Sequence, residues 1–363
     1  MTVESLQRNQ LTTILATRNQ PESVSAQLQL LERSGLDCSI IVADSSDASV
    51  APAVRKACGC IAQYRHFGSE LSLHDKLFEA ISIVKTPYVL LCPDKKITFP
   101  HAIKRSLAHL TENADYVAAL GYVIRYFSNP AEVDLNQIFL FTPSIADDDA
   151  LQRHYNLMRR YQPSIWAVFR KDALVTAVEQ ARSMHGALFQ EIMFMNALAI
   201  KGKIARLPVV FSLHGTDSTA LGNSHPLYWF CKDSRSFFEH YVRYRNALAA
   251  FIEQHYDYVS LESNVSEIID AIHAIWFQSN FDGGVLNHSV QLMLGGTLPR
   301  LPEARHASPR LEAEGNVVVR SRKGKRRYIW RHEVLNAEPK EEISISLDEL
   351  EYVEYQLDHY FAD

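Results

Sequence analysis

The stretch TPYVLLCPDKKITFP, residues 86–100, decides the predicted fold. Its apolar run, residues 88–92, has the length of a buried strand in a parallel sheet, because helices cover both faces of such strands. A polar loop over residues 93–96 follows, and Pro100 suits the first turn of the next helix. Parallel sheets bind ligands where their strands end, so we expect the acidic residue of this loop, Asp94, to face a ligand.

Two earlier strands lead to the same edge of the predicted sheet. Residues 11–16 and 38–43 are short β-rich segments, and residues 23–34 between them carry apolar side chains at helical spacing. This order predicts a right-handed βαβ unit with parallel strands. The polar residues that follow the two strands at this edge are Thr17, Arg18, Asn19 and Asp44.

Three later segments add polar residues to the prediction. Residues 70–84 form a predicted helix whose apolar stripe leaves out Lys76, so we expect a solvated lysine, with contact to a ligand phosphate as the alternative. Residues 187–200 are apolar on nearly every face, which predicts a buried helix with Glu191 as its only ionisable group. His214 follows the last predicted strand of this region.

The order of these segments predicts an α/β fold class, with a Rossmann-like, mostly parallel sheet flanked by helices over residues 1–220. Within it, the region that contains Asn129-Pro130 and the acidic run Asp147, Asp148 and Asp149 is predicted to be irregular. Residues 221–300 are predicted to be a helical extension rich in aromatic residues, and residues 301–363 a small tail with a β-hairpin and an acidic helix. The hairpin has a basic tip that contains Arg322, Lys323 and Lys325.

Composition limits the possible classes of function. The chain has 363 residues, 47% of them hydrophobic and 22% charged, which is typical of a globular protein. Its formal net charge of -5 argues against a general nucleic-acid binder, which needs a basic surface. No apolar run suits a signal peptide or a membrane span, and the five scattered cysteines are typical of reduced thiols. We therefore expect a cytoplasmic protein without a transmembrane segment.

Three segments along the predicted sheet edge carry a resemblance to a known family. TILATRNQP at 13–21, IIVADSSD at 40–47 and VKTPYVLLCPDKK at 84–96 resemble segments of inverting glycosyltransferases of family 2. The last is similar to a bacterial subgroup with a TPYV-LCADDD pattern. Glu191 and VVFSLHG, residues 209–215, also fall in the order of that family, so the resemblance covers residues 10–220.

This resemblance implies a GT-A fold and an enzyme that transfers a sugar with inversion at the anomeric carbon. The implied donor is a nucleotide-diphospho-sugar, with a UDP-sugar expected first, and the acceptor is a glycan or another molecule with a hydroxyl group. Synthesis of a surface polysaccharide or modification of a glycan is the role that such an activity would serve.

The resemblance also implies roles for single residues. Glu191 is the candidate general base, because inversion needs a carboxylate that takes the acceptor proton; the alternative is a buried glutamate satisfied by its neighbours. The basic tip would contact an acceptor or a donor phosphate, or be a solvated loop. The strand-end residues are otherwise turn formers, and His214 is otherwise a capped or solvated side chain. The expected donor-binding residues are Thr17, Arg18, Asn19, Asp44, Lys76, Asp94, Lys95, Lys96 and His214.

The sequence departs from the family at the metal site. In the family, carboxylates of the acidic loop help to bind a divalent cation that bridges the two donor phosphates. Here Asp94 alone remains, and Lys95 and Lys96 stand where acids are expected. A protonated lysine cannot ligate a hard cation, so we expect activity without a metal, with a lysine ammonium group offsetting the charge of the leaving group. If Mn²⁺ or Mg²⁺ does bind, Asp94 and His214 are the candidate ligands.

Two other functions are considered. The degenerate acidic loop is consistent with a catalytically inactive homologue that binds a nucleotide sugar or a partner protein. A nucleotidyltransferase is disfavoured, because ATRNQPES at 16–23 lacks a glycine-rich phosphate loop. The aromatic residues of residues 221–300 are typical of a core or of a homo-oligomer interface, with stacking on sugars as the alternative.

Overall fold

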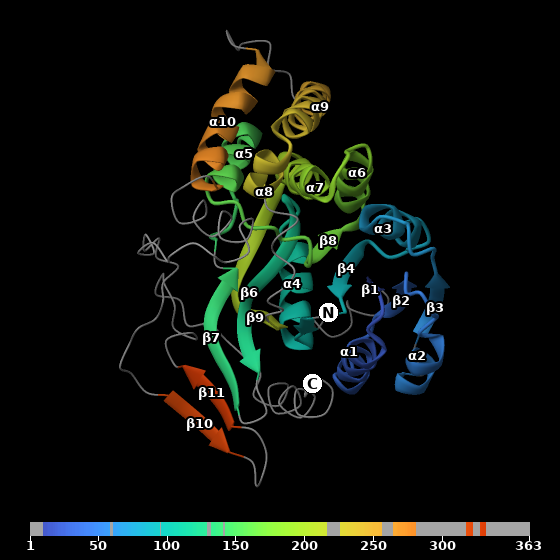
Figure 1. Ribbon diagram of the computed structural model, residues 1–363. Helices are drawn as coiled ribbons and strands as arrows, with labels where there is room; N and C mark the ends of the chain where they lie inside the picture. Colours follow the sequence, from blue (N-terminus) through green and yellow to red (C-terminus); the bar gives the residue numbers. More distant parts are fainter. Residues whose placement is uncertain are drawn as a thin grey trace.

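A mixed sheet flanked by helices runs through the protein (Figure 1). The computed structural model describes residues 10–58, 61–94, 96–128, 132–140, 142–215, 226–255, 264–280, 317–321 and 327–331. Its strands are β1 (Leu11–Thr17), β2 (Ser39–Asp44), β3 (Ile61–His66), β4 (Tyr88–Pro93), β5 (Lys96–Thr98), β6 (Tyr116–Ser128), β7 (Glu132–Leu140), β8 (Val168–Arg170), β9 (Lys203–Gly215), β10 (Val317–Ser321) and β11 (Arg327–Arg331). The strand order is β10-β11-β7-β6-β8-β4-β1-β2-β3, with β9 beside β6 and β5 beside β9.

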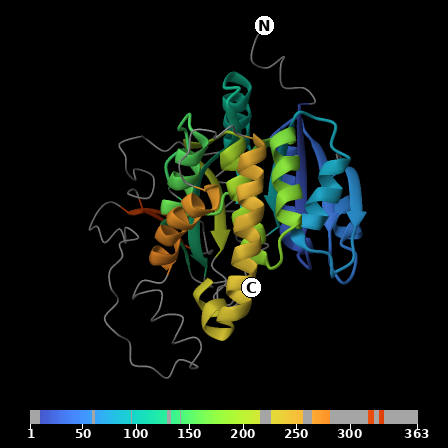
Figure 2. The ribbon, with the colours of Figure 1, turned by 90° about the horizontal axis from the view of Figure 1, so that it is seen from above.

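The described helices connect these strands and cover the sheet (Figures 1 and 2). They are α1 (Pro21–Arg33), α2 (Ala51–Ala57), α3 (Leu73–Ser82), α4 (Pro100–Glu112), α5 (Ala150–Arg159), α6 (Lys171–Arg182), α7 (Ala187–Lys201), α8 (Pro226–Lys232), α9 (Ser234–His255) and α10 (Val265–Asn280). Pro100 opens α4 as predicted, because the first turn of a helix needs no N–H from this residue. The predicted α/β fold class is confirmed.

Four neighbouring strands, β3, β2, β1 and β4, form the parallel half of the sheet. Thr17 is paired with Asp44, and Ala16 with both Ala43 and Pro93, so β1, β2 and β4 end side by side. Every residue of β1 and β4 is buried, as expected of strands covered on both faces. The predicted βαβ units and their common edge are therefore confirmed.

The other half of the sheet is mixed and differs from the sequence prediction in two strands. Residues 96–98 form β5, which is antiparallel to β9, whereas Lys96 was expected in a loop. Residues 132–140 form β7, which returns antiparallel to β6, although they lie within the region expected to be irregular. β5 pairs with a strand far away in the sequence, which local patterns do not encode, whereas β7 pairs with the strand directly before it.

One glycine allows β6 and β9 to pair closely. A Cβ atom at Gly121 would lie 2.1 Å from the carbonyl oxygen of Val209 on β9. No side chain fits in that space, so the parallel pairing of Tyr122 with Val210 requires glycine at the preceding position.

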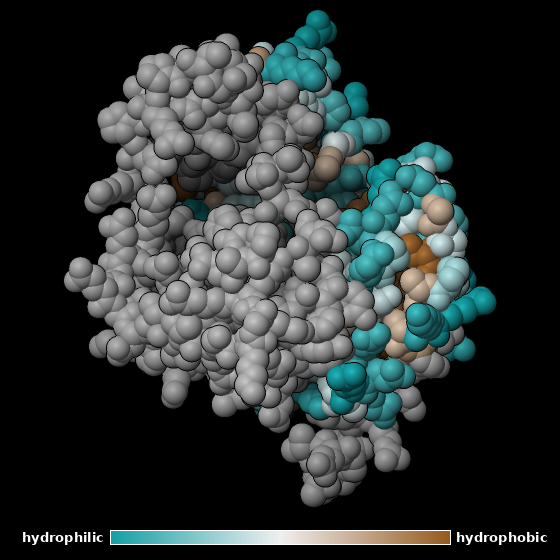
Figure 3. All heavy atoms as spheres, turned by 60° about the horizontal axis from the view of Figure 1, so that its bottom comes forward, coloured by the Kyte–Doolittle hydropathy of each residue, from teal (hydrophilic) through white to brown (hydrophobic). Residues whose placement is uncertain are grey.

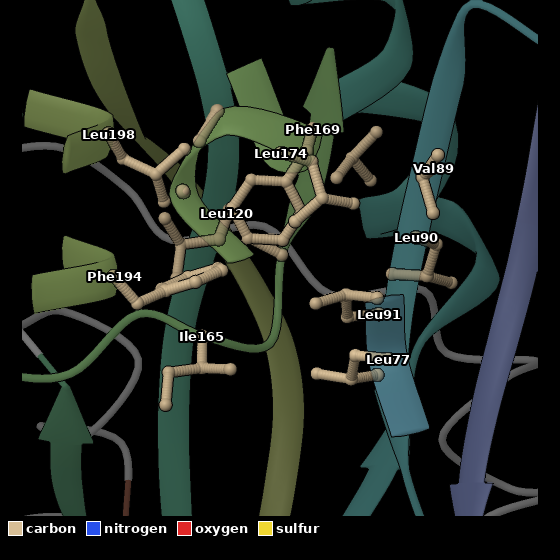
Figure 4. Packing of buried hydrophobic residues seen from close by; sticks show 14 of the residues in the cluster. Leu77, Val89, Leu90, Leu91, Leu120, Ile165, Phe169, Leu174, Phe194 and Leu198 are labelled. Atoms are coloured by element: carbon tan, nitrogen blue, oxygen red, sulfur yellow. The ribbon is translucent and has the colours of Figure 1, made fainter. Parts of the chain in front are cut away.

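The core lies between the sheet and α7 (Figure 4). Leu91 of β4, Leu120 of β6 and Phe169 of β8 are at most 1% exposed. The Phe169 ring meets the ring of Phe194 on α7 edge to face, with 5.9 Å between centroids. Because α6 and α9 also pack against α7, this helix is apolar nearly all round, as predicted.

The aromatic residues of α8 and α9 extend this core. The Phe189 ring of α7 lies 5.5 Å from the Trp229 ring, 5.6 Å from the Phe237 ring and 5.5 Å from the Tyr244 ring. Phe237, Tyr241 and Tyr244 are buried, whereas Phe238 is 51% exposed. Most of these aromatic residues therefore belong to the hydrophobic core, which is one of the two roles predicted for them. On the face shown in Figure 3, the described surface residues are mainly hydrophilic, and apolar ones lie in small separate areas.

Several predictions concern the ends of the chain and its cysteines. β10 and β11 form the predicted hairpin, and β11 pairs with β7, while the basic tip and the acidic helix lie outside the described residues. The predicted boundaries between regions of the chain, at residues 220 and 300, stay predictions. None of the described helices has the length and apolarity to cross a membrane. Cys38, Cys92 and Cys231 are free thiols, but Cys58 is disulfide-bonded, so the expectation of reduced cysteines is wrong there.

A buried polar chain joins α5, α7, α9 and α10. His154 Nδ1 donates to Asn196 Oδ1 at 2.5 Å, Asn196 Nδ2 donates to the Tyr244 hydroxyl at 3.0 Å, and that hydroxyl lies 3.3 Å from His273 Nε2. All four side chains are at most 1% exposed. Burial lowers the pKa of His154 from 6.5 to about 4, against the opposing hydrogen bond to Asn196. Burial also lowers the pKa of His273.

We predict that this chain makes the protein sensitive to mild acid. The unfolded chain protonates His154 near pH 6.5, while the folded protein keeps it neutral to about pH 4, so stability is lost as the pH falls through that interval. For His154 alone, the free energy of unfolding should fall by about 2 kcal/mol between pH 7 and pH 5. Urea unfolding at both pH values measures this change.

The variant H154Q should show a smaller difference between the two pH values. The matched control is H185N, which removes an exposed histidine and should keep the wild-type difference. Equal free energies of unfolding at pH 7 and pH 5 in the wild-type protein would contradict the prediction.

Candidate functional site

The loops after β1 and β4 are joined by a hydrogen bond. The backbone N–H of Arg18 donates to Asp94 Oδ2 at 2.8 Å, which places the carboxylate at the end of β1. Asp94 is partly exposed, so it can meet a ligand from this position. The strand-exit location predicted for Asp94 is therefore observed.

Asn19 joins the loops after β1 and β2. Its φ of 57° is in the left-handed region, which asparagine tolerates better than most residues. Its backbone N–H donates to Ser46 Oγ at 2.7 Å, and its side-chain Nδ2 donates to Asp47 Oδ2 at 3.0 Å. The N–H of Asp47 donates back to Asn19 Oδ1 at 3.0 Å. Asn19 thus ties the loop after β1 to the loop after β2 through these hydrogen bonds.

Asp44 is fully buried and holds the turn after β2. Its Oδ1 accepts the N–H of Ser46 at 2.8 Å, and its Oδ2 accepts the N–H of Val50 at 3.0 Å and the hydroxyl of Tyr64. Burial raises the pKa of this carboxyl group, but the hydrogen bonds from Ser46, Tyr64 and Val50 outweigh burial and lower it. Asp44 is therefore an ionised group whose acceptors serve the loop, as the turn-former alternative expects.

Lys76 is buried at the edge of the sheet, and the expectation of a solvated lysine is wrong. It is 4% exposed, and its Nζ donates to the Thr17 carbonyl at 3.1 Å and to Ser45 Oγ at 2.9 Å. Burial lowers the Lys76 pKa, whereas the charges of Asp94 and Asp44 raise it. Lys76 is one of the buried residues of α3, together with Leu77 and Ala80, because residues three or four apart share one face of a helix.

Thr17 contributes a polar atom without a partner. The residue is 1% exposed, and its Oγ1 makes no hydrogen bond with the described residues. A buried hydroxyl of this kind costs free energy unless a ligand or a water satisfies it. Its place beside Lys76 fits a role in ligand binding.

Pairing of β5 with β9 brings Lys96 and His214 together. The two residues face each other in the antiparallel register, and both are partly exposed. Lys96 follows Asp94 by two residues, so a lysine and a histidine lie next to the strand-end carboxylate. Lys95 lies outside the described residues, as do Arg322, Lys323 and Lys325.

Glu191 lies on α7 within the electrostatic reach of Lys96. Burial raises the pKa of its carboxyl group, and the hydrogen bond from Tyr161 and the charge of Lys96 oppose that rise. The Tyr161 hydroxyl donates to Glu191 Oε1 at 3.1 Å. A carboxylate with a raised pKa and one fixed oxygen can accept a proton at its other oxygen.

Tyr161 is the residue that the sequence analysis missed. It lies between α5 and β8, in a segment without periodic pattern, and its ring is 6.4 Å from the ring of Trp276 on α10. Burial raises the pKa of its phenol, with the nearby Glu191 charge adding to the effect. An isolated tyrosine gives no signal in one sequence, so the structure alone identifies it.

We call Thr17, Asp44, Lys76, Asp94 and Lys96 the edge site. Asp44 is committed to its loop, so Asp94 is the carboxylate that a ligand could meet there. Within the described ranges, no three His, Cys, Asp or Glu side chains gather in a way that could hold a metal ion. One carboxylate between Lys76 and Lys96 is a poor ligand set for a divalent cation, which prefers several oxygen ligands.

Comparisons with known proteins gave matches at the level of structure alone. The chain is similar to S. aureus TarS, with 12% identity and a TM-score of 0.48, over 76% of this chain and 44% of TarS. It is also similar to S. aureus TarS 1-349, with 12% identity and a TM-score of 0.42, over 79% of this chain and 92% of that chain. A third structure is the mannosyltransferase PcManGT from Pyrobaculum calidifontis in complex with GDP-Man and Mn²⁺, with 10% identity and a TM-score of 0.41, over 79% of this chain and 85% of that chain. No protein-family model matches the sequence, and no curated protein matches it.

We predict that Tyr161 and Lys96 hold the Glu191 pKa below the value that burial alone would give. Both Y161F and K96M should therefore raise the Glu191 pKa, because each removes an interaction that favours the carboxylate. Carbon-13 NMR titration of labelled glutamate carboxyl groups measures the change, with the variant E191Q identifying the Glu191 signal.

The control for the tyrosine is Y155F, on the neighbouring helix α5, which should leave the Glu191 titration unchanged. A Glu191 pKa that is the same in Y161F and the wild-type protein would disprove the proposed influence of the Tyr161 hydroxyl.

Proposed function

We propose that this protein is an inverting glycosyltransferase, which moves a sugar from a nucleotide-diphospho-sugar, expected to be a UDP-sugar, to a hydroxyl group of a glycan or another acceptor. One observation carries the proposal: Glu191 of the apolar helix α7 accepts a hydrogen bond from the Tyr161 hydroxyl at 3.1 Å, and burial raises the pKa of its carboxyl group against the opposing charge of Lys96. This arrangement combines a base with a cation at the edge where such sheets bind nucleotides. The resemblance of the sequence to family 2 supports it.

The edge site would bind the donor. Lys76 and Lys96 supply positive charge for the diphosphate, and the Thr17 hydroxyl has hydrogen-bonding capacity to spare. Asp94 would accept a hydrogen bond from a donor hydroxyl, and Asp44 would act by holding the loop after β2 in place. Arg18, Asn19 and His214 would line the same edge, as the resemblance implies.

The chemistry needs one proton transfer and one displacement. Glu191 takes the proton of the acceptor hydroxyl while the acceptor oxygen attacks the anomeric carbon from the face opposite to the leaving group. The bond between that carbon and the phosphate oxygen breaks, and the nucleoside diphosphate leaves with the electron pair. The ammonium group of Lys96 offsets the negative charge that develops on it. A single displacement of this kind inverts the anomeric carbon.

A divalent cation is not required by this scheme. Asp94 and His214 are the residues that would hold Mn²⁺ or Mg²⁺, but Lys96 is a neighbour of both and would repel it. The ligand set therefore fits a metal ion poorly, and the lysines fit the role of charge stabilisation better.

A second candidate function is a catalytically inactive homologue that binds a nucleotide sugar or a partner protein. The single available carboxylate, Asp94, favours this alternative, whereas the base-like setting of Glu191 favours the enzyme. Three further points stay predictions. They are a contact of the basic tip with an acceptor or a phosphate, a homo-oligomeric state, and a cytoplasmic location.

We predict that E191Q removes transfer but not donor binding. Glutamine cannot take the proton, so kcat should fall by about 10²- to 10⁴-fold, the usual contribution of general base catalysis. The assay measures release of UDP from a panel of UDP-sugars, with and without glycan acceptors. Stabilisation of the protein by the donor in a thermal shift assay should be unchanged.

The control E179Q changes an exposed glutamate on α6 and should keep full activity. If E191Q turns over as fast as the wild-type protein, Glu191 is not the base. If the wild-type protein binds UDP-sugars without any turnover, the inactive homologue is the correct function.

We predict that turnover persists in excess EDTA and depends on Lys96. The variant K96A should lower kcat about 10²-fold, which is the effect of removing one group that stabilises transition-state charge. The control is K85A, which removes an exposed lysine that precedes β4, at the end of this strand opposite to Asp94. It should keep the wild-type rate. An absolute requirement for Mn²⁺ or Mg²⁺ would overturn the metal-independent mechanism.

A further inference from the structure

A cavity that the proposed glycosyl transfer does not use lies where α5 ends and β9 begins. Its volume is about 140 Å³, several times the roughly 30 Å³ that one water molecule occupies in the liquid. The walls come from residues 142–145, the last turn of α5, residues 162–164 and the first part of β9. None of the edge-site residues lines it.

The lining is rich in positive charge. It includes Arg159, Arg160 and Arg206, and among the described residues that line it there is no aspartate or glutamate. Arg159 and Arg160 lie at the end of α5, where cations also stabilise the helix dipole. Arg206 lies on β9, so the helix dipole of α5 does not explain why an arginine is present at that position.

Arg206 is held in the wall by neutral acceptors. Its Nη1 donates to the Gly121 carbonyl at 2.5 Å, and its Nε donates to the Thr142 carbonyl at 3.1 Å. Burial lowers the pKa of Arg206 to about 10, so the guanidinium group still carries its charge at neutral pH. No described carboxylate forms an ion pair with it. A partly buried cation without a partner of opposite charge favours binding of an anion.

Two hydroxyl groups complete the set of donors. Thr142 Oγ1 and Ser164 Oγ each accept from Arg206 Nη2 at 3.4 Å, at the long end of hydrogen bonding. Each hydroxyl has one hydrogen to donate, and neither gives it to any residue that the structure describes. Arg160 is exposed and has no ion-pair or hydrogen-bond partner in the described part of the chain.

We propose that this cavity binds a phosphate group. Its lining offers guanidinium and hydroxyl donors from different segments of the chain, which suits a tetrahedral anion with three or four oxygens better than a planar carboxylate with two. The phosphate accepts hydrogen bonds from Thr142 and Ser164 and pairs with Arg160 and Arg206. The source is either inorganic phosphate or a phosphate ester on a larger molecule.

Calorimetric titration of the full chain with inorganic phosphate tests the proposal, at constant ionic strength with chloride as the balancing anion. Wild-type protein should bind phosphate, and S164A and R160A should each weaken binding about tenfold, since each removes a hydrogen bond to a charged group. Neither variant removes a contact that holds Arg206 Nε or Nη1, so both are expected to fold.

Two controls separate the cavity from other basic surfaces. R243A removes an exposed arginine of α9, and K85A removes an exposed lysine outside the cavity and the edge site; both should keep the wild-type affinity for phosphate. Titration with glycerol phosphate identifies the source of the phosphate. Tighter binding of glycerol phosphate than of inorganic phosphate indicates an ester. Equal or weaker binding indicates the free anion.

Three outcomes would overturn the proposal: no binding of phosphate by the wild-type protein, wild-type affinity in both S164A and R160A, or the same weakening in R243A as in R160A. If S164A fails to fold, T142V tests the second hydroxyl in the same way. The proposal does not depend on glycosyl transfer, so an inactive protein that binds phosphate here would leave it intact.

Discussion

The ammonium group of Lys76 lies where β1 and β2 end, and the arrangement of the site depends on it. Moving such a charge out of water costs several kcal/mol, which two hydrogen bonds and two nearby carboxylates offset in part. Its two hydrogen bonds go to Thr17, the last residue of β1, and to Ser45, which follows β2. Lys76 therefore fixes the backbone from which Arg18 holds Asp94. A neutral side chain at this position would leave the Thr17 carbonyl and the two carboxylates without their shared cation.

The parallel half of the sheet could be predicted from the sequence because its signals are local. β2 and β4 contain continuous apolar runs, β1 is rich in β-forming residues, all three are followed by polar residues, and the helix between β1 and β2 has a clear period. β5 and β7 could not be predicted, since pairing with β9 and β6 decides their conformation. The same limit applies to side chains. The periodic pattern placed Lys76 on the polar side of its helix, while its burial comes from the ends of two strands that no window of sequence includes.

Glu191 shows how the fold supports a reactive group. The rest of α7 is packed against the sheet and against α6 and α9, so the helix is fixed and its one carboxylate has little freedom. The sequence pattern identified this carboxylate because an acid on an apolar helix is a local conflict, and such conflicts are expected at functional sites. The same reasoning could not identify Tyr161, because this residue causes no such local conflict. Its hydroxyl meets Glu191 across 30 positions of the chain, a contact that the fold creates and no local pattern encodes.

The polar chain from His154 to His273 has a consequence for how the protein could have evolved. Asn196 of α7 uses both its oxygen and its nitrogen on partners from other helices, and Phe189 of the same helix packs on Trp229, Phe237 and Tyr244. A chain cut at residue 220 would expose that ring and leave the amide without the Tyr244 hydroxyl. The later helices are therefore not a module that can be gained, lost or exchanged alone; substitutions in α7 and α9 must be accepted together, and grafting either helix into a relative would need the other.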